Sequence, residues 1–190
     1  MPQRKAALRE RIAKALALIS PLDRVALSAQ AQARLIETPE WIAARTVMLY
    51  HSDETEVETH DLVLAALHTG KRVGLPRTEK GARTMTVLEI LDVKRDLEVS
   101  RFGFKEPRKR LLTIEPEEID LVVVPGRAFD RHGTRLGRGA GYYDRFIAKH
   151  KLRAVTIGLA YDLQIVDEVP RQPHDRKIDL IVTESRVVRP

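Results

Sequence analysis

The sequence predicts an α/β fold, a single three-layer domain in which helices cover both faces of a mostly parallel central sheet. The apolar runs at 119–125 and 154–161 are continuous, which is typical of strands buried on both faces. Along the chain, such runs alternate with amphipathic helical patterns. The length of 190 residues fits one compact domain, so we treat 1–190 as a single unit.

Two helices are expected before the first strand. Between residues 4 and 19, apolar residues recur at helical spacing and the basic residues lie largely off that face. The Ser-Pro pair at 20–21 ends this helix. A second helix is expected over 23–36, with Asp23 as a cap-like residue at its start. Trp41 follows, and we expect it to pack in the core.

Strand patterns begin after the second helix. The short apolar runs at 46–50 and 71–76 are predicted strands, and the segment 58–70 between them is a predicted helix that ends at a glycine. A strand, a helix and a strand in succession indicate parallel pairing. The run at 84–91 is expected to add a strand, and 101–110 is expected to be a basic loop.

The second half of the chain repeats this alternation. Residues 119–125 are predicted to form a buried central strand, and 140–150 a helix. Two more buried strands are expected at 154–161 and 178–184. Because no internal repeat, low-complexity segment or clear linker interrupts the chain, we expect the strands to share one sheet.

Composition narrows the chemistry that is available. Cysteine is absent, which excludes disulfides, thiolate nucleophiles and cysteine-ligated metal centres. The N-terminal stretch MPQRKAALRERIAKALALIS has no apolar run near the roughly 20 residues that a membrane helix needs, and no secretory pattern. We therefore expect a cytoplasmic protein with no membrane partner. The net charge of +6 indicates an anionic partner, without distinguishing nucleic acid from a phosphorylated or carboxylated small molecule.

A glycine-rich, basic stretch, GRAFDRHGTRLGRGAGYYDRF at 126–146, lies between a predicted strand and a predicted helix. This position puts it at the carboxyl edge of the sheet, where α/β proteins bind ligands. Glycines allow several backbone N–H groups to converge on phosphate oxygens, and Arg135 and Arg138 can add charge-assisted bonds. The stretch matches neither GxxxxGK[ST] nor GxGxxG, so its spacing alone leaves a purely structural turn open.

Asp144 follows the tyrosine pair of the same stretch. A carboxylate beside a phosphate site is a candidate Mg²⁺ ligand. In the first turn of a helix, an aspartate also stabilises the helix dipole. Both interpretations stay open on the residues alone.

The stretch PGRAFDRHGTRLGRGAGYYDRF resembles the signature of the 5-formyltetrahydrofolate cyclo-ligase family, also called 5,10-methenyltetrahydrofolate synthetases. KAALR, SDETEVET and GLAYDLQIVDEVPRQPHDRKIDLIVTE agree with the same family in order and spacing. The resemblance implies an ATP- and Mg²⁺-dependent cyclisation of 5-formyltetrahydrofolate to 5,10-methenyltetrahydrofolate, which releases ADP and phosphate. The family mechanism passes through a phosphorylated formyl group, an imidate phosphate. It also implies a monomer.

The resemblance further implies roles for residues at matching positions. Arg138 and Tyr143 would be catalytic, Asp53 and Glu58 would bind the folate, and Asp144 and Asp175 would hold Mg²⁺. The ATP site would comprise Lys5, Arg9, Arg135, Leu136, Gly137, Arg138, Gly139, Ala140, Gly141, Tyr142 and Tyr143. Contact between Lys5 or Arg9 and ATP requires the N-terminal helix to fold over the glycine-rich loop. His174 is the one histidine that we place near this chemistry.

Without the family, several of these residues have simpler interpretations. Lys5 is typical of a solvated helix face, Glu58 of a helix N-terminus, and Asp175 of a proline-flanked turn. The basic run Arg108–Arg110 is unassigned: it attracts a folate polyglutamate tail or serves as surface charge.

Two other functions are consistent with parts of the sequence. The charge and the GRGAGYY segment are compatible with a nucleic-acid-binding module, although Asp130 and Asp144 interrupt the basic stretch and the motif is not repeated. A nucleotide-binding paralogue without folate chemistry would keep the glycine-rich loop. Of the three functions we expect the cyclo-ligase, an enzyme that binds ATP and 5-formyltetrahydrofolate and does not bind nucleic acid.

Overall fold

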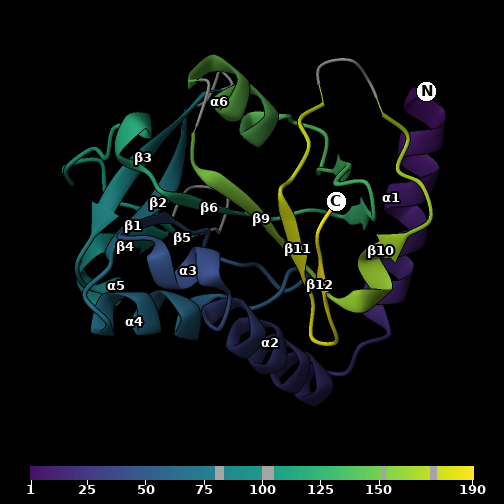
Figure 1. The fold of residues 1–190 in the computed structure, drawn as a ribbon, viewed down its shortest axis with the longest axis horizontal. Helices are drawn as coiled ribbons and strands as arrows, with labels where there is room; N and C mark the ends of the chain where they lie inside the picture. Colours follow the sequence, from purple (N-terminus) through teal and green to yellow (C-terminus); the bar gives the residue numbers. More distant parts are fainter. Residues whose placement is uncertain (80–83, 100–104, 151–152, 172–174) are drawn as a thin grey trace.

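The computed structural model describes residues 1–79, 84–99, 105–150, 153–171 and 175–190. Its main feature is a seven-stranded sheet (Figure 1). In spatial order, the strands are β12 (Val187–Val188), β11 (Leu180–Val182), β9 (Val155–Leu159), β6 (Leu121–Val124), β1 (Thr46–Met48), β2 (Arg72–Glu79) and β3 (Thr84–Ile90). None of the helices in these ranges is long and apolar enough to cross a membrane.

The five inner strands of this sheet are parallel. β6 pairs in parallel with β1 and β9, and β2 and β11 extend the parallel set on either side. The two edge strands, β3 and β12, are antiparallel to their neighbours. The predicted mostly parallel sheet is therefore confirmed, and its predicted strands all occur.

The central strand β6 shows why its sequence is continuously apolar. All four of its residues are fully buried. Leu121 and Val123 belong to one core cluster, whereas Val122 and Val124 belong to the other. Because successive side chains of a strand point to opposite faces, a strand covered on both sides needs apolar residues at every position.

Helices cover both faces of the sheet, as the three-layer prediction requires. One face packs against α1 (Pro2–Ala17), α2 (Pro21–Ile36) and α4 (His60–His68), which contribute Leu16, Leu35 and Leu62 to its core cluster. The other face packs against α6 (Tyr142–His150) through Phe146. Figure 1 shows α6 on the opposite side of the sheet from α2 and α4.

The start of α2 differs from the prediction. Ser20, rather than Asp23, is its N-cap residue, and the Ser20 Oγ accepts a 3.1 Å hydrogen bond from the Asp23 backbone N–H. Pro21 occupies the first helical position, where a missing N–H costs nothing. The Ser-Pro pair therefore begins the second helix, whereas α1 already ends at Ala17, before the pair that was predicted to end it.

Other differences concern short elements. Part of the expected basic loop is strand β5 (Lys105–Pro107), which pairs with β4 (Leu97–Val99); residues 101–104 lie outside the described ranges. A three-stranded sheet comprises β10 (Ile165–Val166), β7 (Ala128–Asp130) and β8 (Arg135–Leu136). Three short helices, α3 (Pro39–Ala43), α5 (Val93–Asp96) and η2 (Asp162–Gln164), complete the connections, with η1 at Pro116–Glu118. Trp41 on α3 is buried, as expected.

Candidate active site

A cavity of about 1400 Å³ opens at the carboxyl edge of the parallel strands. Its walls come from α1, the segments that follow β1 and β6, the β2–β3 pair and the start of α6. The lining includes Lys5, Arg9, Tyr50, His51, Asp53, Glu56, Arg77, Lys105, Lys109, Arg135, Gly137, Arg138, Gly139, Ala140, Gly141, Tyr142, Tyr143, Asp144 and Asp175. Its volume exceeds the usual range for one small ligand, so two ligands fit side by side.

The glycine-rich loop has an unusual backbone at two positions. Gly139 has a φ of 114° and Gly141 a φ of 67°, both in the region that side-chain-bearing residues disfavour. The next residue, Tyr142, begins α6. Backbone N–H groups at such a turn and at the following helix N-terminus attract anions. The loop therefore provides a wall suited to phosphate groups.

Helix α1 contacts this loop, as the predicted roles of Lys5 and Arg9 require. The Arg9 Nε donates a 2.8 Å hydrogen bond to the Gly137 carbonyl. The Lys5 Nζ lies 2.6 Å from Asp175 Oδ2, and both side chains are largely buried. Two cations from the N-terminal helix thus line the same cavity as the loop.

Arg135 and Asp144 form an ion pair behind the loop. Arg135 Nη2 lies 2.8 Å from Asp144 Oδ2, and its Nη1 donates to the Pro125 carbonyl at 3.0 Å. The Arg135 side chain is only 4% exposed, whereas Asp144 is 19% exposed. This geometry lets Arg135 orient the Asp144 carboxylate toward the cavity.

Tyr143 contributes a buried hydroxyl to the cavity wall. Within the described ranges this hydroxyl has no hydrogen-bond partner. Burial raises the pKa of Tyr143 well above its ordinary value, and the nearby Glu56 carboxylate raises it further. Tyr143 is therefore a neutral phenol whose O–H can donate to a bound ligand.

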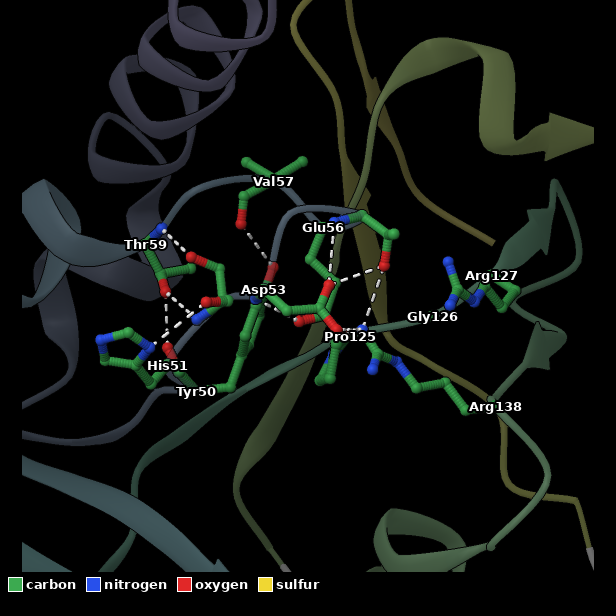
Figure 2. A network of polar contacts seen from close by, with 12 residues as sticks. Tyr50, His51, Asp53, Glu56, Val57, Thr59, Pro125, Gly126, Arg127 and Arg138 are labelled. Atoms are coloured by element: carbon green, nitrogen blue, oxygen red, sulfur yellow. Dashed lines mark hydrogen bonds and ion pairs between the residues drawn. The ribbon is translucent and has the colours of Figure 1, made fainter. Parts of the chain in front are cut away.

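Arg138 joins the glycine-rich loop to the segment that follows β1 (Figure 2). Its Nη2 pairs with Asp53 Oδ2 and lies 2.8 Å from Glu56 Oε1. Burial raises the pKa of Glu56, and the Arg138 guanidinium opposes that shift. Burial also raises the pKa of Asp53, but hydrogen bonds from Thr55 and Arg138 outweigh it and leave a net lowering.

Two carboxylates of the cavity are suited to a Mg²⁺ ion whose other ligands are substrate phosphates and water. Asp144 and Asp175 both line it, yet no group of three histidine or acidic residues in the described part of the chain can hold a metal ion. Mg²⁺ commonly binds through one or two carboxylates together with substrate phosphates and water. Two aspartates beside a loop that is suited to phosphate groups fit that pattern.

Comparison with known proteins decides the family. The model of the 5-formyltetrahydrofolate cyclo-ligase family matches residues 1–184. The chain belongs to this family. The recognition based on the glycine-rich stretch, the α/β fold class and the enzyme class are thereby confirmed.

Individual members of the 5-formyltetrahydrofolate cyclo-ligase family match over most of their length. The probable 5-formyltetrahydrofolate cyclo-ligase of Schizosaccharomyces pombe is 32% identical over 170 residues, which cover 82% of this chain and 83% of the relative. The Escherichia coli K12 5-formyltetrahydrofolate cyclo-ligase is 28% identical over 171 residues, 89% of this chain and 94% of the relative. The solved structure of Aquifex aeolicus 5,10-methenyltetrahydrofolate synthetase has a TM-score of 0.85 at 32% identity, and the match covers 97% of this chain and 92% of that one.

Glu58 does not lie where its predicted substrate-binding role requires. Its side chain is exposed and absent from the cavity wall, and its backbone bonds to α2, with its N–H donating to Ser28 Oγ and its carbonyl accepting from Gln32. Thr59, not Glu58, is the N-cap residue of α4. Glu56 lines the cavity instead. The placement of Glu58 therefore does not support its predicted substrate-binding role, and Glu56 is the glutamate of this segment that the cavity wall includes.

The other predicted residues gather at the cavity, although their exposure differs. Leu136 also lines the cavity, but it is almost fully buried and belongs to a core cluster. Tyr142 packs against the core cluster beneath α6 and lies under the Arg145 guanidinium. His174 lies outside the described residues.

The basic run Arg108–Arg110 is divided between different environments. Lys109 lines the cavity, together with Lys105 of β5. The Arg108 Nε donates to the Arg95 carbonyl at 2.9 Å, on the outside of the same region. Only part of the run therefore faces a ligand.

Sequence reasoning missed several residues of the cavity wall besides Glu56. His51 is half-buried beside Asp53, and burial lowers its pKa. Arg77 on β2 pairs with Glu98 at 2.7 Å. Their positions in the sequence could have indicated them. His51 directly follows the first predicted strand and Arg77 the second, and ligands bind at the edge of the sheet where these strands end. Which of these side chains face inward depends on tertiary packing.

Proposed function

We propose that this protein catalyses the ATP- and Mg²⁺-dependent cyclisation of 5-formyltetrahydrofolate to 5,10-methenyltetrahydrofolate, with release of ADP and phosphate. The observation that supports this most is the combination, in one cavity, of a glycine-rich loop, basic side chains and carboxylates. These side chains include Lys5, Arg9, Lys105, Arg135, Arg138, Asp53, Glu56, Asp144 and Asp175. Family membership supplies the reaction class.

The cations of the cavity have the placement that phosphoryl transfer needs. This reaction depends mainly on positioning and charge stabilisation, because the phosphates carry the developing charge. Lys5 and Arg9 from α1 face the glycine-rich loop, and we assign them to the ATP phosphates. Arg138 is assigned to the transferred phosphate, since it is the partly exposed guanidinium at the centre of the loop.

Asp144 and Asp175 are the residues that would hold Mg²⁺, which neutralises phosphate charge when it is bound. Arg135 orients Asp144 through their 2.8 Å ion pair. Asp175 is paired with Lys5, so these two neighbouring groups are positioned to bind the metal and a phosphate. These assignments use the protein's own carboxylates and need no protein nucleophile.

The folate is assigned to the side of the cavity around Glu56. The pterin presents a two-donor N–H edge that matches a carboxylate. Tyr143 can donate a hydrogen bond from its neutral hydroxyl to the same ligand. With the formyl oxygen near the loop, attack on the γ-phosphate gives a phosphorylated formyl group, and N10 then closes the ring and displaces phosphate. Lys105 and Lys109 are suited to the glutamate tail.

The decisive experiment is an absorbance assay for 5,10-methenyltetrahydrofolate with purified protein, 5-formyltetrahydrofolate, ATP and Mg²⁺, in which ATP and Mg²⁺ are omitted in turn. The expected result is product formation in the complete mixture alone. Folded protein that binds ATP and gives no product would contradict the proposal. We further propose a monomeric, cytoplasmic enzyme, which size-exclusion chromatography and cell fractionation test.

A further inference from the structure

Arg138 occupies the carboxylates that we assign to the folate. The guanidinium extends from the glycine-rich loop across the cavity to Glu56 and Asp53, which follow β1 (Figure 2). It also donates to Thr55 Oγ1 at 3.2 Å. A residue assigned to phosphate therefore pairs, without nucleotide, with groups assigned to the other substrate.

Only one oxygen of Glu56 is open to exchange. Glu56 Oε2 accepts a 3.2 Å hydrogen bond from the Asp53 backbone N–H, which fixes the carboxylate within its own turn. Glu56 Oε1 accepts the Arg138 guanidinium instead, and the Glu56 side chain is 11% exposed. A pterin N–H donor that approaches Oε1 therefore meets the guanidinium of Arg138 at that oxygen.

Arg138 is able to leave this position. Its side chain is 40% exposed, in contrast to the 4% of Arg135. It lies between Gly137 and Gly139, neither of which carries a side chain that would hinder its rotation. The phosphates of a nucleotide on the same loop carry several negative charges, so they compete with the Asp53 and Glu56 carboxylates for the guanidinium.

A second cation remains near Glu56 when Arg138 moves. Arg127 precedes β7, and its guanidinium interacts electrostatically with Asp53 and Glu56. Its Nη1 is buried and has no hydrogen-bond partner in the part of the chain that the structure describes. Arg127 can therefore balance part of the Glu56 charge after the exchange.

We propose that Arg138 couples the two substrate sites: without nucleotide it blocks Glu56, and nucleotide phosphates draw it away and so raise the affinity for the folate. This inference rests on the proposed function. Because coupling between two binding sites is reciprocal, the folate raises nucleotide affinity by the same factor. The nucleotide shifts Arg138 because its phosphates pair with the guanidinium in the displaced position and not in the position beside Glu56.

The test is calorimetric titration of 5-formyltetrahydrofolate into the protein, with and without Mg²⁺ and a non-hydrolysable ATP analogue that prevents turnover. The expected result for the unchanged protein is a dissociation constant at least about fivefold lower with the analogue. In Arg138→Ala, the nucleotide-free affinity should rise and the ratio between the two conditions should approach one. Arg131→Ala is the matched control, since Arg131 is exposed on the neighbouring turn and absent from the cavity wall.

Arg138→Ala is also expected to weaken nucleotide binding. The folate affinity measured without nucleotide does not depend on that loss, so it still tests whether Arg138 blocks Glu56. An unchanged or weaker nucleotide-free affinity in this variant overturns the coupling, as does equal folate affinity with and without the analogue in the unchanged protein. The failure of the proposed function has another signature. It would appear as no binding of 5-formyltetrahydrofolate in any condition and no product in the absorbance assay.

Discussion

The carboxylates of this protein fall into two groups that differ in their partners. The first group, which we call the structural group, accepts hydrogen bonds from backbone N–H groups. Asp120 accepts from the N–H groups of Arg45 and Thr46, both at 2.8 Å, and so joins β6 to the start of β1. Asp179 accepts from Thr156 in the same way, at 2.8 Å, between β11 and β9.

The second group, in the cavity, pairs with side-chain cations. Asp175 pairs with Lys5, Asp144 with Arg135, and Glu56 with Arg138. A backbone N–H cannot leave without breaking the fold, whereas a side-chain cation can rotate to another anion. The comparison teaches that partner type, more than burial, separates a structural carboxylate from one available to ligands. Asp53 and Glu56 lie between the groups, because a backbone N–H holds one oxygen of each carboxylate and Arg138 the other.

The largest expected effect is at Asp144, which we assign to Mg²⁺. Asp144→Asn keeps an oxygen that can accept from Arg135 but loses the charge that Mg²⁺ needs. We expect kcat to fall about 100-fold or more, which is roughly 3 kcal/mol in the activation free energy. Steady-state rates over a range of Mg²⁺ concentrations measure this, with exposed Asp61→Asn as the control. Near-normal rates at limiting Mg²⁺ would place Asp144 in the structural group.

The next largest effect should come from the structural group. Asp130 is buried and accepts from the N–H groups of His132, Thr134 and Val169, at 2.9 to 3.0 Å. Asp130→Ala leaves these donors unsatisfied, and we expect the free energy of unfolding to fall by about 2 to 3 kcal/mol. Urea denaturation measures the loss.

Asp167→Ala, at an exposed position nearby, is the control for Asp130→Ala and should change stability little. Equal stabilities of the two variants would contradict the division into two groups. It would mean that the hydrogen bonds from backbone N–H groups to Asp130 contribute no more to stability than the exposed charge of Asp167.

A smaller effect separates Glu56 from Glu58. Glu56→Gln replaces one carboxylate oxygen by an amide that cannot accept from the pterin, and we expect the dissociation constant of 5-formyltetrahydrofolate to rise about tenfold. Glu58→Gln should leave it unchanged, because that side chain is exposed outside the cavity. Calorimetry in the presence of an ATP analogue measures both. A larger effect at Glu58 would return the substrate role to that residue.

The smallest effect concerns pH and Asp96. The Arg95 side chain, together with the backbone N–H groups of Leu91 and Asp92, lowers the pKa of Asp96 from 3.8 to about 2. Because the folded-state pKa is below the ordinary value, this stabilisation is present above about pH 4 and is lost as the pH falls toward 2. Asp96→Asn should cost about 1 kcal/mol at neutral pH. Urea titrations measure the free energy of unfolding of both proteins between about pH 4 and pH 2, where the difference between them should shrink. A difference that stays constant over this range would contradict the assignment to Asp96 ionisation.

Much of the fold follows from local pattern. The continuous run at Leu121–Val124 is typical of a strand covered on both faces, and it is the buried centre of the sheet. The helical spacing around Leu8, Ile12 and Leu16 likewise identifies the buried face of α1. Short elements such as α3 and β10 carry too few residues for periodicity to show, and they depend on neighbours that the sequence does not place.

The sequence by itself determined the α/β class, the family and the position of the glycine-rich loop, because these depend on periodicity and on a contiguous motif. Tertiary structure alone decided that Glu56 rather than Glu58 faces the cavity, since Ser28 and Gln32 on α2 hold residue 58. It also decided that Arg138 crosses to Glu56, over a sequence distance of 82 residues that no local pattern spans. Side-chain direction in an irregular segment is fixed by contacts with distant elements, and these arise only when the chain is folded.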